Sequence, residues 1–238
     1  MTDSPFAQNL VLRAALAARP SPDGRKWKIV NFEGGRQFWK EHDTLTQVIF
    51  PLHGVLSVQI LADSAKQVDI AMVGREGFAG VSVFLGEPKA RSSVMSLTAG
   101  QAVLMPRKDF EAYLRNAAFR DSAVRYVRSL MHMLARFSVC NRAHLIENVC
   151  VGRLLLMQDR TRADSFQVTQ DSLSRMLGVR RATVSRAASQ LLKEGAIHYD
   201  RRGRLTILDR ARLEKFACPC YRAMKADFDR FVRSQGGL

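Results

Sequence analysis

The hydrophobic pattern of the chain changes once, near residue 108, and this change restricts the fold more than any other feature of the sequence. Between residues 25 and 110, segments rich in β-branched and aromatic residues alternate with Gly, Pro and Asp: KWKIVNF, TQVIFPL, VLSVQIL, QVDIAMV, SVMSLT and AVLMP. Strands at intervals of about ten residues, without helical stretches between them, are typical of antiparallel sandwiches and barrels. A parallel sheet would need crossover helices. We therefore expect an antiparallel sandwich or barrel here.

Beyond residue 108 the period becomes helical, and the segment 110–146 contains almost no helix breaker. This pattern predicts a long helix over 111–146 that carries one apolar stripe at helical spacing. The stripe consists of Val124, Val127, Met131, Leu134 and Phe137. It can pack on the chain's own barrel or against the same helix of a second copy, and the pattern leaves both alternatives open.

The remaining elements divide the chain into five parts. A short helix over 5–19 ends at Pro20, and ENVCVGRLLLMQDR (147–160) predicts another helix. AIHYDRRGRLTIL (196–208) predicts two short strands around an Arg-rich turn, and a final helix begins near Asp209 and resumes after the sequence CPC. The result is an α+β chain with these parts: 1–24, N-terminal helix and lead-in; 25–110, strands; 111–146, long helix; 147–210, helices and hairpin; 211–238, C-terminal helical extension.

The segment SRMLGVRRATVSRAASQLLKEG (174–195) predicts two short helices joined by a tight turn. Thr169 is a plausible N-cap for the first helix, and Leu173 and Leu177 give that helix an inward face. Gly178 is suited to end it, because the chain there needs a left-handed residue. Two short helices joined by a Gly-containing turn have the layout of a helix-turn-helix.

The second helix of the pair, over 180–194, has two contrasting faces. On a helical wheel, one arc holds Val184, Ala187, Ala188, Leu191 and Leu192. The opposite arc holds Ala182, Arg186, Ser189, Gln190 and Lys193, with Arg181 and Ser185 at its border. This polar face has no acidic residue before Glu194. A face with cations and small hydrogen-bonding residues but no acid suits phosphates and base edges, so we interpret it as a DNA-reading surface.

Each residue type on this surface suits a particular contact. Arg186 lies mid-face, where its guanidinium can reach guanine O6 and N7, and Arg181 lies in the leading turn, which enters the major groove. Hydroxyl and amide groups suit phosphate oxygens. The arginines after the helix pair would form a wing on the DNA backbone. The predicted DNA-binding residues are Thr169, Gln170, Arg180, Arg181, Thr183, Ser185, Arg186, Ser189, Arg201 and Arg202, with Arg204 as a further wing residue.

The overall charge agrees with an anionic partner but does not locate its binding site. The chain has a net charge of +15, and its basic excess is spread over both halves. The apolar run NLVLRAALAA is interrupted by Arg13 and preceded by Asp3, unlike a signal peptide, and no apolar segment reaches the length of a membrane span. Four cysteines are too few for a disulfide scaffold. We expect a cytoplasmic protein without a membrane partner.

The segment VTQDSLSRMLGVRRATVSRAASQLLKEGAI resembles the helix-turn-helix of the Crp/Fnr family of bacterial transcription regulators. The CVGRLLLM helix, the long helix and the strand-rich first half are similar to that family in order and length. The resemblance covers about residues 20–215. It implies a cyclic-nucleotide-binding-like β-roll (a jelly roll), a dimerisation helix over 111–146 and a winged helix-turn-helix over 147–210. It also implies a homodimer that regulates transcription at a palindromic DNA site and is not an enzyme. RNA polymerase is a candidate further partner, although contacts with it cannot be read from the sequence.

The sequence departs from the family at two sites. Many members have Glu where this chain has Ala182, so the half-site is expected to differ. In cyclic-AMP-binding members an acid binds the ribose and an Arg-Ser/Thr pair binds the phosphate. Arg91 and Ser92 occupy a similar place here, but Gly77-Phe78-Ala79-Gly80 stands where the acid would be, unless Glu76 replaces it. We expect no cofactor, with cyclic nucleotide binding as the less favoured alternative.

The cysteines and histidines do not form a recognised metal motif in the sequence. Cys140 and Cys150 lie on predicted helices, and Cys218 and Cys220 form a C-x-C pair far along the chain. Iron–sulfur and zinc sites need several ligands at short spacings. The histidines are scattered, at His42, His53, His132, His144 and His198. We therefore expect buried, inert thiols and no metal site.

A second class of function stays open at this stage. The strand-rich half could be a regulatory module or a small-barrel enzyme, and the helical end could bind a protein partner instead of DNA. No nucleophile–base pair, Gly-rich phosphate loop or carboxylate pair in the sequence supports an enzyme. Salt distinguishes the two interpretations, because binding through several phosphates weakens steeply with salt concentration.

Overall fold

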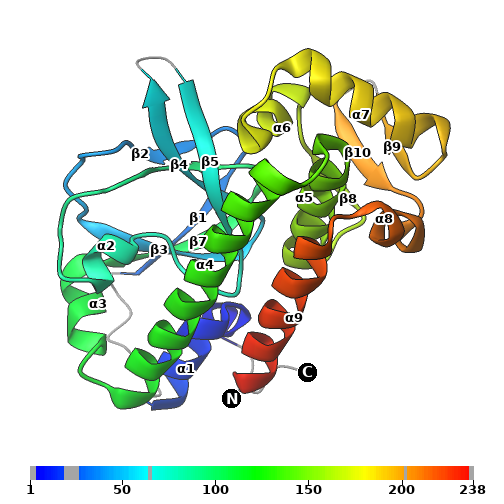
Figure 1. The fold of residues 1–238 in the computed structure, drawn as a ribbon. Coiled ribbons are helices and arrows are strands. Elements are labelled where there is room, and N and C mark those ends of the chain that lie inside the picture. The colour runs from blue at the N-terminus through cyan, green and yellow to red at the C-terminus, as the bar shows by residue number, and fades with distance from the viewer. Residues whose placement is uncertain (1–3, 19–26, 64–65, 201–202, 236–238) are drawn as a thin grey trace.

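A computed structural model describes residues 4–18, 27–63, 66–200 and 203–235 of the chain. The first half is a roll of two antiparallel sheets, with strand orders β1-β7-β3 and β2-β6-β4-β5 (Figure 1). All six strands expected from the sequence are present. The strands are β1 (Lys28–Phe32), β2 (Gln37–Trp39), β3 (Gln47–His53), β4 (Leu56–Asp63), β5 (Lys66–Val73), β6 (Ser93–Ser96) and β7 (Gly100–Pro106). The extra strand, β2, was missed because three residues are too short to show an alternating pattern.

The helices around the roll differ in three respects from the expected pattern. The N-terminal segment is split into η1 (Pro5–Gln8) and α1 (Leu10–Ala18), and α2 (Val81–Phe84) lies within the roll. The single helix predicted over 111–146 is wrong: the structure has α3 (Arg107–Tyr113) and α4 (Ala117–Ala143). The break lies at Asn116, whose side chain accepts a hydrogen bond from Phe119 N at 3.1 Å and caps α4. An asparagine inside a helical pattern can thus begin a new helix.

Helix α4 runs along the roll and packs against α1, β5 and α9. Its buried face includes Phe119, Tyr126, Met133 and Phe137. Tyr126 lies so close to the chain after β5 that only a glycine fits at residue 77: a Cβ built there would lie 1.8 Å from Tyr126 Cε2. The Tyr126 hydroxyl also donates to Phe78 O at 3.1 Å. These contacts fix α4 to the loop that follows β5.

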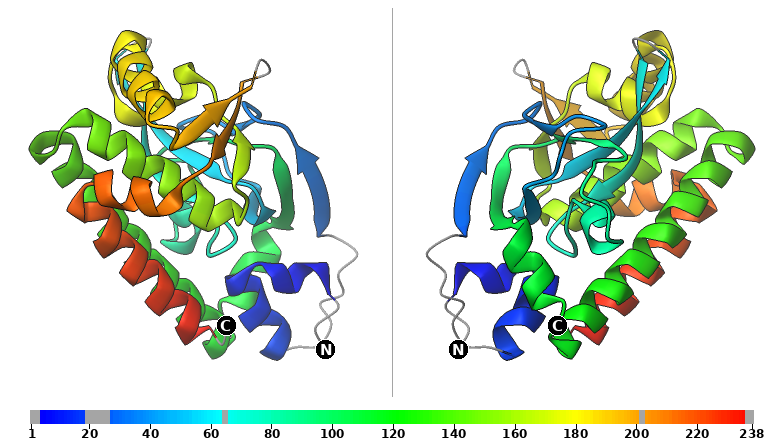
Figure 2. Two further views of the ribbon diagram at one scale, coloured as in Figure 1. Left: turned by 90° about the vertical axis from the view of Figure 1, so that its right-hand side faces the viewer. Right: turned by 90° about the vertical axis from the view of Figure 1, so that its left-hand side faces the viewer.

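The second half confirms the predicted order of helices and hairpin. It contains α5 (Ile146–Thr161), β8 (Ser165–Gln167), α6 (Gln170–Leu177), α7 (Arg181–Lys193), β9 (Ile197–Tyr199), β10 (Arg204–Ile207), α8 (Arg210–Phe216) and α9 (Pro219–Ser234). The three strands form a small antiparallel sheet in the order β8-β10-β9. Helix α9 returns alongside α4, so the C-terminal extension packs on the long helix (Figures 1 and 2).

The two halves share a buried junction. Helix α6 packs against β5, and α5 contributes two buried arginines, Arg153 and Arg160. Arg160 Nε lies 2.8 Å from Glu76 Oε1 of the roll, and both side chains are buried. None of the described helices combines the length and apolar character that crossing a membrane would require.

Candidate DNA-binding site

The helix pair α6–α7 is built as its sequence predicts. Thr169 caps α6, because its Oγ1 accepts a hydrogen bond from Ser172 N at 3.0 Å. Gly178 ends the helix in the left-handed conformation, with φ of +67°, which a residue with a side chain adopts only with strain. Arg180 is extended and precedes the first turn of α7. Both helices pack against α5, which supports the pair from beneath.

The inward face of α7 follows the helical wheel closely. Val184, Ala187, Ala188 and Leu191 are buried, as predicted. Leu192 is the exception, because its side chain is 39% exposed. It lies about 80° around the helix from Val184, at the edge of the apolar arc, where the supporting helices no longer cover it.

The opposite face of α7 is open to solvent. Arg180, Arg181, Ala182, Arg186, Ser189, Gln190 and Lys193 are all exposed. The helix contains no Asp or Glu, and its three ionised side chains are cations. The only described ion pair that involves this helix joins Arg181 Nε to Asp171 Oδ1 of α6, at 3.6 Å with both side chains exposed. Such a solvent-exposed pair is weak, so an incoming phosphate can displace it.

Two of the residues predicted to bind phosphate also connect the helices of the motif. Ser185 Oγ donates to Gln170 Oε1 at 2.8 Å, and both residues are only partly exposed. Thr183 is also partly exposed, in the first turn of α7. The Ser185–Gln170 bond joins the two helices and uses the amide oxygen of Gln170. The amide nitrogen carries two further donors, which suit phosphate oxygens.

The β9–β10 hairpin follows α7 and lies at the same end of the molecule (Figure 2). Arg204 begins β10 and is exposed, and Asp200 Oδ1 accepts a hydrogen bond from its backbone N–H at 2.9 Å. Arg201 and Arg202, the other predicted wing residues, lie outside the described residues. The hairpin predicted over 196–208 is therefore present, and Arg204 is the wing cation that the structure places.

The five residues predicted for the dimer stripe do not share one face. Val124 and Met131 are 49% and 64% exposed, and Val127 and Leu134 are partly buried beside them. Phe137 is buried, with the guanidinium of Arg153 stacked on its ring 2.9 Å from the centroid. Thirteen residues turn a helix by about 140° from its starting direction, so Phe137 faces away from Val124. Its assignment to an intermolecular stripe does not agree with this position.

A partly open pocket of about 360 Å³ lies between the roll and α4, next to the residues predicted to bind a ligand. Arg91 and Ser92 line it, but Arg91 Nη2 lies 2.7 Å from Glu87 Oε1, which raises the pKa of Arg91. Glu76 is not among the lining residues, because it is bound to Arg160. The other lining residues are mostly apolar and include Trp39, Ile70, Leu130 and Leu134, the last two from α4.

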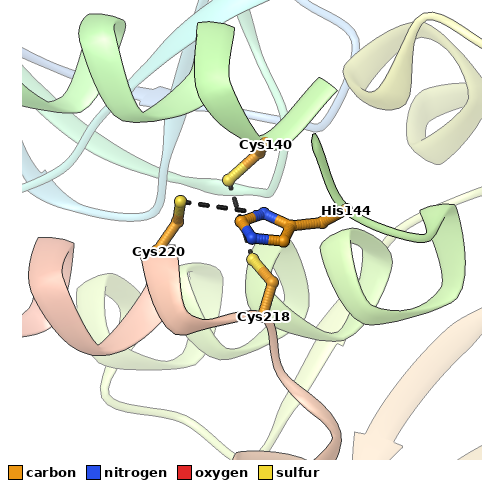
Figure 3. Close-up of side chains that lie close together, drawn as sticks. All are labelled: Cys140, His144, Cys218 and Cys220. Carbon is orange, nitrogen blue, oxygen red and sulfur yellow. Dashed lines mark hydrogen bonds between the residues drawn. The ribbon is translucent and has the colours of Figure 1, made fainter. Parts of the chain in front are cut away.

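The cysteines lie closer together than the sequence indicates. Three of the four, Cys140, Cys218 and Cys220, meet His144 at the junction of α4 and α9 (Figure 3). Their four ligand atoms lie within 4.8 Å of one another. The expected burial of the thiols is confirmed, but the meeting of three of them was not anticipated from the sequence, while Cys150 is buried elsewhere on α5. The missed signal is a pair of short spacings, C-x₃-H at one helix end and C-x-C at another helix start.

Comparison with protein families finds a match within the second half of the chain. Residues 151–216 match the Crp-like helix-turn-helix domain. No curated protein sequence matches the chain. The matched domain contains α6, α7 and the β9–β10 hairpin, and ends just before Cys218. It is a domain of transcription regulators, which supports the prediction that the chain is not an enzyme.

Solved structures with the same fold cover most of the chain. FixK2 from Bradyrhizobium japonicum superposes with a TM-score of 0.65 at 16% identity, over 81% of this chain and 98% of FixK2. A CRP-family transcriptional regulator from Thermus thermophilus gives 0.65 at 17% identity, over 79% and 96%. The c-di-GMP-responsive regulator CLP from Xanthomonas campestris gives 0.60 at 12% identity, over 83% and 97%. At these identities the similarity establishes the fold: a β-roll, a long helix and a C-terminal helix-turn-helix.

Proposed function

We propose, on the premise that the chain carries a Crp-like helix-turn-helix domain in the fold of the Crp/Fnr regulators, that it is a homodimer that binds a palindromic DNA site and regulates transcription. The observation that carries this proposal is the exposed face of α7, which presents arginines and small polar residues without an acid. Such a face fits the negative potential and the acceptor-rich edges of the major groove. The site of action is accordingly the cytoplasm, and contact with RNA polymerase stays a prediction.

The exposed part of the α4 stripe supports the dimer. Val124 and Met131 lie on the outer face of α4, with Val127 and Leu134 at its border, and large apolar side chains in such a row favour burial against a partner. Two copies of α4 paired by a two-fold axis would place the two α7 helices symmetrically. A two-fold-symmetric protein then reads two half-sites about one helical turn of DNA apart.

The pocket beside the roll is lined mainly by apolar side chains, which supports a binding site for an apolar effector. Glu76, the acid that could bind the ribose of a cyclic nucleotide, is held in a buried pair with Arg160. Arg91 is in an exposed and therefore weak pair with Glu87, so the occupied acid is the feature that disfavours a cyclic nucleotide. Leu130 and Leu134 of α4 form part of the wall, so an effector would touch the proposed dimer helix directly. The proposal therefore does not include a cyclic nucleotide as cofactor.

The first experiment is selection of random duplex DNA on the purified full-length protein at near-physiological salt, followed by sequencing. We expect an enriched two-fold-symmetric motif with half-site centres about 10–10.5 base pairs apart. A DNA affinity that scarcely changes between low and high salt would contradict the proposal, because contacts to several phosphates weaken steeply with salt, and would favour a protein partner for the helical end.

Two variants then test how α7 reads this motif. Arg186→Ala should weaken binding to the selected site by about 1–3 kcal/mol and relax its sequence preference, because Arg186 faces the base edges. Arg204→Ala is the matched control: it removes an exposed cation of the wing and should weaken all sequences about equally. Identical behaviour of the two variants would refute the assignment of α7 to the groove.

A further inference from the structure

Three buried thiols and one imidazole converge where α4 ends and α9 begins (Figure 3). Cys140 Sγ lies 3.6 Å from Cys218 Sγ, and Cys220 Sγ lies 3.8 Å from His144 Nδ1. The three cysteines are each at most 3% exposed. Four soft or borderline ligands in a single buried cluster are the donor set that zinc prefers in proteins.

Two of the six distances between ligand atoms match the edges of a tetrahedron around one ion, and all six are within 4.8 Å. With a zinc–sulfur bond of about 2.3 Å, two thiolates of a tetrahedral site lie about 3.8 Å apart, and a thiolate and an imidazole nitrogen about 3.6 Å apart. The observed separations of 3.6 and 3.8 Å agree with these edges. We propose that Cys140, His144, Cys218 and Cys220 bind one zinc ion in a Cys₃His site that joins the end of α4 to the start of α9.

The local structure explains why four residues from two distant segments can converge. Cys140 lies in the last turn of α4, and His144 is the C-cap residue whose backbone N–H bonds to Cys140 O, so the end of the helix places the two residues close together. Cys218 is the residue before α9, and Pro219 occupies its first position, which fixes the backbone between the two thiols. The positive end of the α9 dipole also favours thiolates at this place. Each helix end therefore provides one preformed pair of ligands.

A buried arginine beside the cluster balances the charge of the proposed site. Three thiolates and a neutral imidazole around Zn²⁺ carry a net charge of −1. Arg153 is 1% exposed, and its Nε and Nη2 have no hydrogen-bond partner among the described residues. Burial lowers the pKa of Arg153 to about 10, while the neighbouring Cys140 and Cys218 oppose this change. A buried, incompletely paired cation next to Cys140 and Cys218 is expected if those thiols are ionised on a metal.

Two other uses of the thiols fit the geometry less well. A disulfide needs sulfurs about 2.05 Å apart and would employ only two of the four side chains. An iron–sulfur cluster spreads its ligands over several irons, whereas all four ligand atoms here lie within 4.8 Å of one another. Four protein ligands leave no position open for substrate or water, so the site is of the structural kind.

The proposed zinc ion would connect the C-terminal extension to the segment that joins α4 and α5. Helix α5, which supports the helix-turn-helix, begins at Ile146, two residues after His144. The ligand pairs lie on either side of the matched domain 151–216, outside its bounds. Zinc binding itself does not depend on the proposed DNA-binding function, so each proposal can fail without the other.

The test is the metal content of the full-length protein, purified without chelators. We expect about one zinc ion per chain, and Co²⁺ in its place should give the intense ligand-field and thiolate charge-transfer absorption of a tetrahedral thiolate site. Removal of zinc with a chelator should lower the melting temperature, because metal binding contributes to folding. Protein that binds neither metal, or that contains iron and absorbs as an iron–sulfur cluster, would overturn the proposal.

Variants identify the ligands even if one of them folds poorly. Cys140→Ala and Cys218→Ala should lose zinc, and His144→Ala should bind it more weakly. His144→Cys should bind it again and shift the Co²⁺ spectrum, because a Cys₄ set also suits the metal. Cys150→Ala is the matched control, since Cys150 is equally buried but outside the cluster. Loss of zinc in Cys150→Ala alone, or full zinc in Cys218→Ala, would refute the assignment.

Discussion

The ion pair between Glu76 and Arg160 is expected to stabilise the junction between the roll and the DNA-binding half. Glu76 lies in the loop after β5, and Arg160 near the end of α5. Their side chains are 6% and 4% exposed. Arg160 also donates to Leu156 O and contacts Met133 Sδ of α4, while Glu76 Oε1 accepts a hydrogen bond from Gly74 N. The pair therefore connects the roll, α4 and α5.

The size of the effect follows from distance and burial. At 2.8 Å, and with an effective dielectric constant of about 20, two unit charges attract each other by about 6 kcal/mol. Desolvation of both ions offsets most of this energy, so the intact pair adds little compared with apolar residues. Removal of one partner leaves the other charge buried without compensation, which costs about 3–5 kcal/mol. We expect this loss in the free energy of unfolding for Glu76→Gln and for Arg160→Met, and a smaller loss than their sum in the double variant.

Urea unfolding can measure these changes with two probes. Trp27 and Trp39, the only tryptophans of the chain, report on the roll, and far-ultraviolet circular dichroism reports mainly on the helical half. Coincident transitions would justify a two-state treatment. Glu87→Gln is the matched control, because Glu87 and Arg91 are 2.7 Å apart but exposed, and its effect should lie within experimental error. If Glu76→Gln lowered the free energy of unfolding no more than Glu87→Gln, this result would refute the argument that burial makes the loss of one partner costly.

Two further substitutions test the packing of α4. Gly77→Ala should lower the free energy of unfolding by about 1–3 kcal/mol, since its Cβ would lie 1.8 Å from the buried Tyr126 ring. Gly152→Ala in α5 is the control: its Cβ would lie 3.5 Å from Tyr221 Cβ and 3.9 Å from Cys218 Sγ, so it should be neutral or stabilising by comparison, and equal effects would contradict the steric argument. Met131→Glu should raise the dimer dissociation constant by about tenfold or more in sedimentation experiments, because a carboxylate would be buried in the proposed interface. Ala118→Glu, exposed at the other side of α4, should leave the dimer intact, and a dimer that tolerates Met131→Glu would exclude this face.

Local patterns predicted most of the elements correctly. Six strands, the capped helix pair and the C-terminal helices were all visible in short stretches, because each depends on residues that are close in sequence. Thr169 and Gly178 mark both ends of α6 through their own backbone chemistry. The failures occur where a local signal is too short or conflicts with a stronger one. Strand β2 has three residues, and Asn116 interrupts a helical pattern that otherwise continues.

Contacts between distant segments were beyond the reach of these patterns. Phe137 was included in the stripe on α4 although its spacing from Val124 already places it on another face of the helix; that Arg153 of the next helix covers it was not visible in the sequence. The cysteine cluster needs α9 to return along α4, so that residues 140 and 218 meet. Nothing in the spacing of the four cysteines determines that return. Periodicity fixes the face that a residue occupies, whereas the packing of helices decides what covers that face.

The buried charges of the described residues are concentrated at the junction between the two halves. Asp69 and Glu76 come from the roll, and Arg153 and Arg160 come from α5. Burial raises the pKa of Asp69, while Gln59, which donates to Asp69 Oδ1 at 2.8 Å, and the more distant Arg175 and Arg153 lower it. Two apolar surfaces could pack in several relative positions with similar free energy. Buried acids and arginines find hydrogen-bond or ion-pair partners in only a few of these positions. The charged junction is therefore expected to specify the orientation of the helix-turn-helix on the roll more than the stability of the chain.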